Sequence, residues 1–278
     1  MSDVTDIAAA EAAATAWGEP AAAPRPVHLR ENAVFDVTFR DGQRVALRLH
    51  RPGYRSPARL AAELAWTEAL ADAAFPCPWP QRTREGGFLA AALDGRLASA
   101  VQWIDGVPLG QTAPMDAPTF GALGALLADL HLTSDAVAPS SLDRPVWDAD
   151  AFCDPEAAVW GRFWDNPALS AGERDALLAA RQRLSARLAA LPAGSVGLIH
   201  ADVLPDNVLA VGPDLVLIDF DDGGYGDRRY DLATALIQHT ERTDYPDLAA
   251  ALVAGYASAG GPGETALHGI EVLMACRA

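Results

Sequence analysis

Three side chains suited to phosphoryl transfer lie close together in the sequence. Asp202 and Asn207 belong to residues 200–207 (HADVLPDN), and Asp219 follows soon afterwards. A carboxylate such as that of Asp202 can accept the proton of an attacking hydroxyl, and the oxygens of Asn207 and Asp219 suit Mg²⁺ bound to nucleotide phosphates. The spacing H-x-D-x(4)-N with a following Asp therefore predicts a catalytic residue at 202 and metal ligands at 207 and 219.

The neighbouring sequence predicts the strands that would position these side chains. A short apolar run at 196–199 leads into the loop. Two further apolar runs, 208–211 and 215–218, flank a Gly-Pro-Asp turn and predict a β-hairpin that ends at Asp219. This context makes the pattern specific, because a bare H-x-D-x(4)-N recurs by chance.

The arrangement resembles the aminoglycoside phosphotransferase and choline kinase superfamily, the small-molecule relatives of protein kinases, from about residue 27 to the end. Residues 218–226 (IDFDDGGYG) and 230–233 (YDLA) are similar to a bacterial subgroup of stress-response Ser/Thr kinases and homoserine kinase relatives. The resemblance implies ATP and Mg²⁺ as cofactors. It also implies two buried supports: His200 would shape the catalytic loop, and Asp231 would bind the loop backbone.

The fold that the resemblance implies is α+β, bilobal and protein-kinase-like. A small antiparallel-sheet N-terminal lobe is expected at 1–101, a hinge at 102–106, and a mostly helical C-terminal lobe with the catalytic loop at 107–278. The backbone of Gln102, Trp103 and Ile104 in the hinge would hydrogen-bond adenine.

The phosphate-binding residues expected from the resemblance depart from the usual kinase pattern. No Gly-rich loop is present, and a turn at Glu31 and Asn32 stands in its place. The sequence contains no lysine, so Arg48 occupies the position of the usual strand Lys, with Glu63 as its helix partner and Glu68 as the rival. Arginine also carries a positive charge and binds phosphate well. The alternatives are an ordinary turn at 31–32 and an exposed strand arginine at 48.

Periodicity and turn residues predict the elements of both lobes. Helices are expected at 7–17, 56–73, 117–132, 171–191, 229–240, 245–257 and 265–277. Ser56 is the expected cap of the helix at 56–73, with Pro57 in its first position. Strands are expected at 27–30, 33–40, 44–50, 79–83, 88–92 and 97–103. The strand at 44–50 is expected to be half-buried, with apolar Val45, Leu47 and Leu49 on one face and polar Arg44, Arg48 and His50 on the other. Residues 142–170, rich in Trp and Asp, are interpreted as a loop-like insertion that packs onto the large lobe. The final helix reaches Ala278 without a cap, which indicates a truncated or unusually short chain.

Composition limits the function classes. Half of the 278 residues are hydrophobic and the net charge is −16, which argues against nucleic acid or an anionic membrane as partner. No signal pattern or membrane-length apolar stretch occurs, and three scattered cysteines (Cys77, Cys153, Cys276) indicate buried thiols in the cytoplasm. The oligomeric state stays open.

These observations predict a phosphotransferase that moves the γ-phosphate of ATP to a hydroxyl. The family resemblance orders the acceptors as a small alcohol or amino alcohol first, then protein Ser/Thr, then an aminoglycoside. Asp221 is expected either to touch a second metal or to be a solvated loop acid. The alternative function is a nucleotide-binding pseudokinase with a regulatory role, suggested by the missing lysine and Gly-rich loop.

Overall fold

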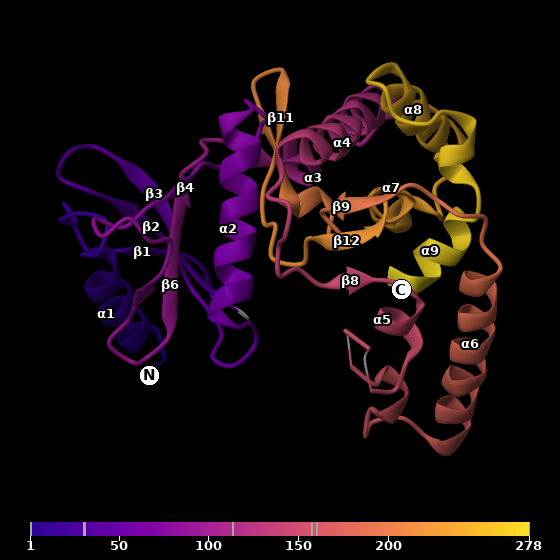
Figure 1. Cartoon of the computed structure of the whole chain (residues 1–278), viewed down its shortest axis with the longest axis horizontal. Helices are drawn as coiled ribbons and strands as arrows, with labels where there is room; N and C mark the ends of the chain where they lie inside the picture. Colours follow the sequence, from indigo (N-terminus) through magenta and orange to yellow (C-terminus); the bar gives the residue numbers. More distant parts are fainter. Residues whose placement is uncertain (1, 30–31, 113, 157, 160, 278) are drawn as a thin grey trace. The chain divides into compact units, whose positions relative to one another are not determined.

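Figure 1 shows the computed structural model, which describes residues 2–29, 32–112, 114–156, 158–159 and 161–277. The chain forms two compact units. The first comprises Met1–Gly106, Val137–Asp143 and Val216–Asp221, and the second comprises Val107–Ala136, Arg144–Leu215 and Asp222–Ala278. The segment that carries Asp219 therefore belongs to the first unit, whereas residues 200–207 belong to the second.

The first unit is built on an antiparallel sheet with strand order β1-β2-β3-β6-β4, in which β5 also pairs with β6. Its strands are β1 (Arg25–Leu29), β2 (Ala33–Thr38), β3 (Arg44–Leu49), β4 (Pro80–Gln81), β5 (Ala90–Ala91) and β6 (Leu97–Gln102). Helix α1 (Ser2–Ala14) contacts β2 and β3, and helix α2 (Pro57–Asp72) contacts β4.

Strand β3 shows why the sheet has one buried face. Val45, Leu47 and Leu49 are fully buried, and they alternate with the partly exposed side chains of Arg44 and Arg48. Small residues of α1 pack on this apolar face together with the buried side chains of β2. The alternation predicted from the sequence therefore places the β3 arginines on the side away from this core.

His50, which follows β3, departs from that prediction. It was expected on the polar face, but it is buried, and its Nε2 lies 2.8 Å from Ser99 Oγ. Burial, reinforced by the nearby charge of Arg48, lowers the pKa of His50 to about 3.

Helix α2 begins as its sequence predicts. The Ser56 hydroxyl accepts a hydrogen bond from the Arg59 N–H at 3.2 Å, and Pro57 occupies the first turn. Leu60, Leu64 and Leu70 form its buried stripe. The cap and this stripe fix the register of the helix, and with it the direction of Glu63.

The second unit is mostly helical. Its helices are α3 (Leu109–Thr112), α4 (Ala117–Val137), α5 (Ala149–Cys153), α6 (Ala171–Ala189), α7 (Arg229–Leu236), α8 (Tyr245–Ser258) and α9 (Ile270–Arg277). Short 3₁₀ turns occur at Phe163–Asp165, Pro205–Asn207, Ile237–His239 and Glu264–Leu267. Two small sheets have the orders β11-β10-β7 and β8-β12-β9. Their strands are β7 (Val107–Pro108), β8 (Val146–Trp147), β9 (Val196–Ile199), β10 (Val208–Val211), β11 (Asp214–Leu217) and β12 (Gly224–Asp227).

Two sequence predictions for this unit are wrong. Residues 142–170 are not one loop, because they contain β8, α5 and a 3₁₀ turn, and β8 pairs in parallel with β12. Residues 265–277 are not one helix. Gly269, at a φ of 74°, separates a 3₁₀ turn from α9, because this left-handed conformation ends helical geometry.

Glycines set the spacing of α4 and α8. A Cβ on Gly124 would lie 2.0 Å from the Leu252 carbonyl oxygen, and one on Gly255 would lie 1.9 Å from the Gly121 carbonyl oxygen. The two helix backbones therefore touch directly, and any side chain at these positions would force them apart.

Two further sequence expectations can be compared with the structure. All three cysteines are unpaired and buried, as expected. Within the described ranges, no helix combines the length and apolar character needed to cross a membrane.

Candidate active site

Arg48 lies between two carboxylates of the first unit. Its Nη2 donates to Asp219 Oδ1 at 2.6 Å, and its Nη1 lies 3.7 Å from Glu63 Oε1. Burial opposes the charged guanidinium, but Asp219, Glu63 and Asp221 outweigh it and raise the pKa of Arg48 above its usual value. The arginine is therefore a permanent cation at the point where the strand and the segment after β11 meet.

The alternative helix partner, Glu68, is engaged elsewhere. Its two carboxylate oxygens accept from Arg82 at 2.8 and 2.6 Å, in the bidentate geometry that arginine favours. Glu63 is buried and faces Arg48, so of the two glutamates only Glu63 is in contact with that arginine.

A cavity of about 70 Å³ in the first unit opens next to this cluster. Its polar end is formed by Arg48, Glu63 and Asp219. The remaining wall is mostly apolar and comes from Val34, Ala46, Leu64, Thr67, Pro78, Ser99, Val101 and Phe220. An apolar pocket that ends in one cation and two carboxylates suits a ring attached to a charged, metal-bound group.

The phosphate turn is only partly described. Glu31 lies outside the described residues. Asn32 is described, and its side-chain Oδ1 accepts from the Arg51 N–H at 3.0 Å. This bond ties the turn to the end of β3, and the Asn32 amide NH₂ is the part of the side chain that could donate to a phosphate.

The hinge residues differ in what they can offer to adenine. The Gln102 N–H donates to the Trp79 carbonyl at 2.8 Å, and the Trp103 N–H donates to the Arg44 carbonyl at 3.1 Å. Within the described part of the chain, no hydrogen bond engages the Ile104 N–H. The N–H groups of Gln102 and Trp103 thus already have protein partners, and the backbone contact of residues 102–104 with adenine stays a prediction.

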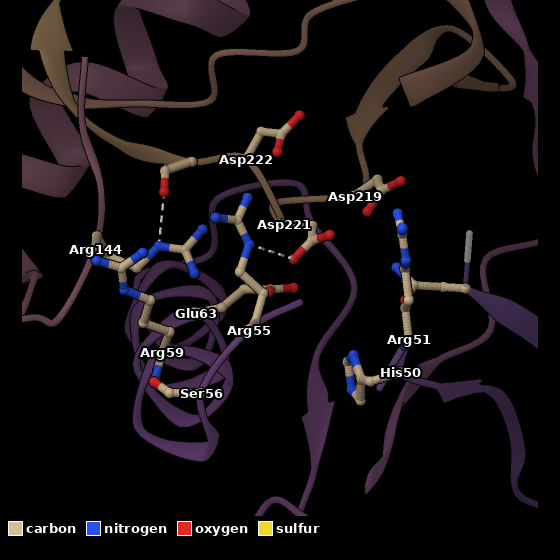
Figure 2. A network of polar contacts seen from close by, with 12 residues as sticks. His50, Arg51, Arg55, Ser56, Arg59, Glu63, Arg144, Asp219, Asp221 and Asp222 are labelled. Carbon is tan, nitrogen blue, oxygen red and sulfur yellow. Dashed lines mark hydrogen bonds and ion pairs between the residues drawn. The ribbon is translucent and has the colours of Figure 1, made fainter. Parts of the chain in front are cut away.

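The segment after β11 is held in an unusual conformation. Asp219 has a φ of 64°, in the left-handed region that non-glycine residues seldom adopt. Figure 2 shows Arg55 directed at Asp221, with Nε 3.7 Å from Oδ1, and both side chains are largely buried. Asp221 is thus not the solvated loop acid that was one of its two expected states.

In the second unit, Asp202 and Asn207 are joined directly. The Asn207 side-chain NH₂ donates to Asp202 Oδ2 at 2.7 Å and to the Asp202 carbonyl at 2.9 Å. Both amide hydrogens are therefore turned towards Asp202, which leaves Asn207 Oδ1 as an acceptor or metal ligand. The other oxygen of Asp202, Oδ1, accepts from Arg277 in the last turn of α9.

Arg277 was missed by the sequence reasoning. The only signal was a basic residue in the last turn of a helix, which is ordinary because a cation is favourable there. Nothing local in the sequence links α9 to residue 202.

A buried hydrogen-bond network supports the loop at 200–207, the predicted catalytic loop. Asp231 accepts from the backbone N–H groups of His200 and Ala201 at 2.8 and 2.7 Å, and its Oδ2 lies 3.0 Å from His131 Nε2. His131 Nδ1 is in turn 2.8 Å from the Tyr256 hydroxyl, whose pKa burial raises to about 12. The network holds Ala201 at a φ of 64°, a conformation that costs free energy and persists where neighbours enforce it.

The predicted metal ligands Asn207 and Asp219 belong to different units, so their shared role stays a prediction. The described residues hold no cluster of three or more His, Cys, Asp or Glu that could bind a metal by itself.

A family model and curated relatives of this chain both describe phosphotransferases. The model of the phosphotransferase enzyme family matches residues 24–269. A homoserine kinase of Gluconobacter oxydans is 34% identical over 211 residues, which is 71% of this chain and 62% of that protein. A homoserine kinase of Acidiphilium cryptum is 35% identical over 187 residues, 65% of this chain and 53% of that protein. The chain thus spans a little over half the length of these curated relatives.

Solved structures agree on the fold. The microcompartment-associated aminopropanol kinase is 27% identical with a TM-score of 0.79, over 95% of this chain and 84% of that one. The amicoumacin kinase hAmiN, solved in complex with AMP-PNP, Ca²⁺ and Ami, is 18% identical with a TM-score of 0.81, over 95% of this chain and 80% of that one. The predicted α+β, protein-kinase-like fold is confirmed.

Proposed function

The chain belongs to the phosphotransferase enzyme family, and on that basis we propose that it transfers the γ-phosphate of ATP, with Mg²⁺, to the hydroxyl of a small metabolite. The homoserine kinases and the aminopropanol kinase reported above support a small acceptor over a protein Ser/Thr, because they are named for small hydroxy compounds. The pseudokinase alternative has no support from these relatives, which are named as kinases.

The single observation that carries the proposal is the Asp202–Asn207 pair on a loop fixed by Asp231. Asp202 is the group that takes the hydroxyl proton as the acceptor oxygen bonds to the γ-phosphorus. The bond from that phosphorus to the β–γ bridging oxygen breaks, and ADP leaves. Phosphoryl transfer requires mainly such positioning and charge neutralisation.

The fit to Mg²⁺ rests on two hard oxygen donors. The hydrogen bonds from Asn207 to Asp202 use only its side-chain NH₂, so Oδ1 can bind a metal, and Asp219 carries a carboxylate. Mg²⁺, when bound, would neutralise phosphate charge and align the γ-phosphate. Arg48 supplies a second positive charge for the phosphates, with Glu63 orienting it, and the cavity of the first unit receives the nucleotide.

The test is ADP release at saturating Mg²⁺ with L-homoserine, amino alcohols, choline, sugars and an aminoglycoside as acceptors. Asp202→Asn should lower kcat by about 10²- to 10⁴-fold, the usual contribution of a positioned base. Asp206→Asn is the matched control, because Asp206 is an exposed carboxylate of the same loop and should leave kcat within about twofold, as expected for surface changes.

Nucleotide binding separates loss of chemistry from loss of fold. The Asp202→Asn protein should still be stabilised by AMP-PNP in a melting experiment. Near-full turnover of Asp202→Asn would remove Asp202 from the mechanism. Failure of the wild-type chain to phosphorylate any acceptor would overturn the proposed function itself.

A further inference from the structure

Arg277 contacts the carboxylate of Asp202, the group proposed to take the proton of the acceptor hydroxyl. We propose that Arg277 binds a carboxylate of the acceptor, so that the substrate is a hydroxy amino acid and not an amino alcohol. The inference rests on the proposed function and names the substrate class of the same site.

The starting point is the state of the Asp202 carboxylate. Oδ2 accepts from Asn207 at 2.7 Å, and Oδ1 is held by Arg277. The guanidinium stabilises the charged carboxylate and so weakens Oδ1 as a base, which makes proton transfer from a hydroxyl easier when the guanidinium has another partner. A binding event that moves Arg277 is therefore part of making Asp202 available.

A carboxylate on the acceptor is the natural partner for that exchange. The guanidinium presents its donors in a planar fork that matches any carboxylate, so the substrate group can replace Asp202 with equivalent bonds. A neutral hydroxyl compound offers only a weaker partner. A cationic amino alcohol adds a like charge next to Arg277 and offers no anion in return.

The position of Arg277 is set by the core. In α9, Val272, Leu273, Met274 and Cys276 are buried, and the Tyr245 hydroxyl lies 3.9 Å from Met274 S. The Arg277 side chain is itself only 17% exposed. The general preference for cations at helix C-termini explains a solvated arginine, but not one that is largely buried against Asp202.

The acceptors of the relatives differ in the group at issue. Homoserine carries a carboxylate and aminopropanol does not. Of the aminopropanols, 3-aminopropan-1-ol is the compound that differs from homoserine only by hydrogen in place of the carboxylate, so this pair isolates the effect of that group. Homoserine kinases and an aminopropanol kinase both resemble this chain, so family likeness leaves the carboxylate undecided. The contact of Arg277 with Asp202 favours an acceptor with a carboxylate over one without it.

The experiment measures kcat/KM for L-homoserine and 3-aminopropan-1-ol with the wild-type chain, Arg277→Met and Arg277→Lys. The wild type should prefer L-homoserine by about 10- to 100-fold, as expected for a charge-assisted contact. The preference should nearly vanish in Arg277→Met and survive in part in Arg277→Lys. Arg187→Met is the matched control, since Arg187 is an exposed arginine in the last turn of α6, and it should keep the wild-type preference.

The outcomes separate the two proposals. Equal use of both acceptors by the wild type, or a preference that Arg277→Met leaves unchanged, would overturn the role of Arg277 while phosphotransfer stands. Absence of transfer to every acceptor in the larger panel would instead overturn the proposed function. Melting temperatures identify a misfolded variant, and Arg277→Lys then provides the measurement because it retains the charge.

Discussion

Arg48 and Asp219 form a direct ion pair of 2.6 Å between a strand of the first unit's sheet and the segment after β11. The pair joins the predicted phosphate-binding cation to the predicted metal ligand, and each partly neutralises the other. A phosphate that binds Arg48 competes with Asp219, and a metal that binds Asp219 competes with Arg48. Nucleotide and metal should therefore bind with positive coupling, because each releases the partner of the other.

Arg48→Met should raise the KM for MgATP by about 10- to 100-fold, since one charge-assisted contact to phosphate is lost. The KM of Arg48→Lys should lie between those of the wild type and Arg48→Met, because lysine keeps the positive charge but lacks the planar guanidinium. The control is Arg82→Met, which breaks the exposed pair with Glu68 and should leave the KM unchanged. If Arg48→Met and wild type have the same KM, Arg48 is a structural arginine only.

Asp231→Ala should destabilise the second unit by about 3–5 kcal/mol, because it leaves buried backbone donors of His200 and Ala201 without an acceptor. Chemical denaturation gives the free energy of unfolding. Asp247→Ala, an exposed carboxylate in the first turn of α8, is the control and should cost less than about 1 kcal/mol. Equal losses in both variants would contradict the supporting role of the buried network.

Gly124→Ala should be destabilising although alanine is the better helix former, because its Cβ would lie 2.0 Å from the Leu252 carbonyl oxygen. The expected loss is about 1–3 kcal/mol, the range for overpacking. Gly172→Ala in α6 meets no atom within 4 Å and should be neutral or stabilising. A stabilised Gly124→Ala protein in thermal melts would show that α4 and α8 do not pack as described.

Stability of the first unit should fall as the pH drops from about 6.5 to about 4.5. The folded pKa of His50 is about 3, below its usual 6.5, so in this window the unfolded state takes up a proton that the folded state does not. The slope from this residue approaches about 1.4 kcal/mol per pH unit. His50→Gln should flatten the profile.

The matched control for that pH profile is His28→Gln. His28 is an exposed histidine of β1, and its replacement should leave the slope as it is. An unchanged slope in His50→Gln, measured by urea unfolding at several pH values, would argue against burial of a neutral His50.

Local sequence was sufficient where the structure depends on local rules. The Ser56 cap, the β10–β11 hairpin and the alternation of β3 follow from turn chemistry and periodicity, and all three occur. Arg48 and Glu63 could be paired from the resemblance, because their strand and helix positions imply it. The break at Gly269 had a visible signal, a glycine within the expected helix, that the prediction passed over.

Long-range pairing was beyond sequence reasoning. Strand β8 is only two residues long and becomes a strand because β12 pairs with it. Two residues are too few for a periodic pattern that would predict a strand. The contact of Arg277 with Asp202 likewise depends on how α9 packs on α7. The burial of His50 follows from Ser99 on a neighbouring strand, which a pattern within β3 cannot reveal.

Arginine at position 48 also changes the chemical reactivity of the proposed nucleotide pocket. The chain has no lysine, so no side-chain amine exists for acylating or sulfonylating nucleotide probes to capture. Dicarbonyl reagents such as phenylglyoxal, which attack guanidinium groups, are the appropriate labels. A survey of ATP sites that relies on lysine acylation would not label this chain, however tightly it binds ATP.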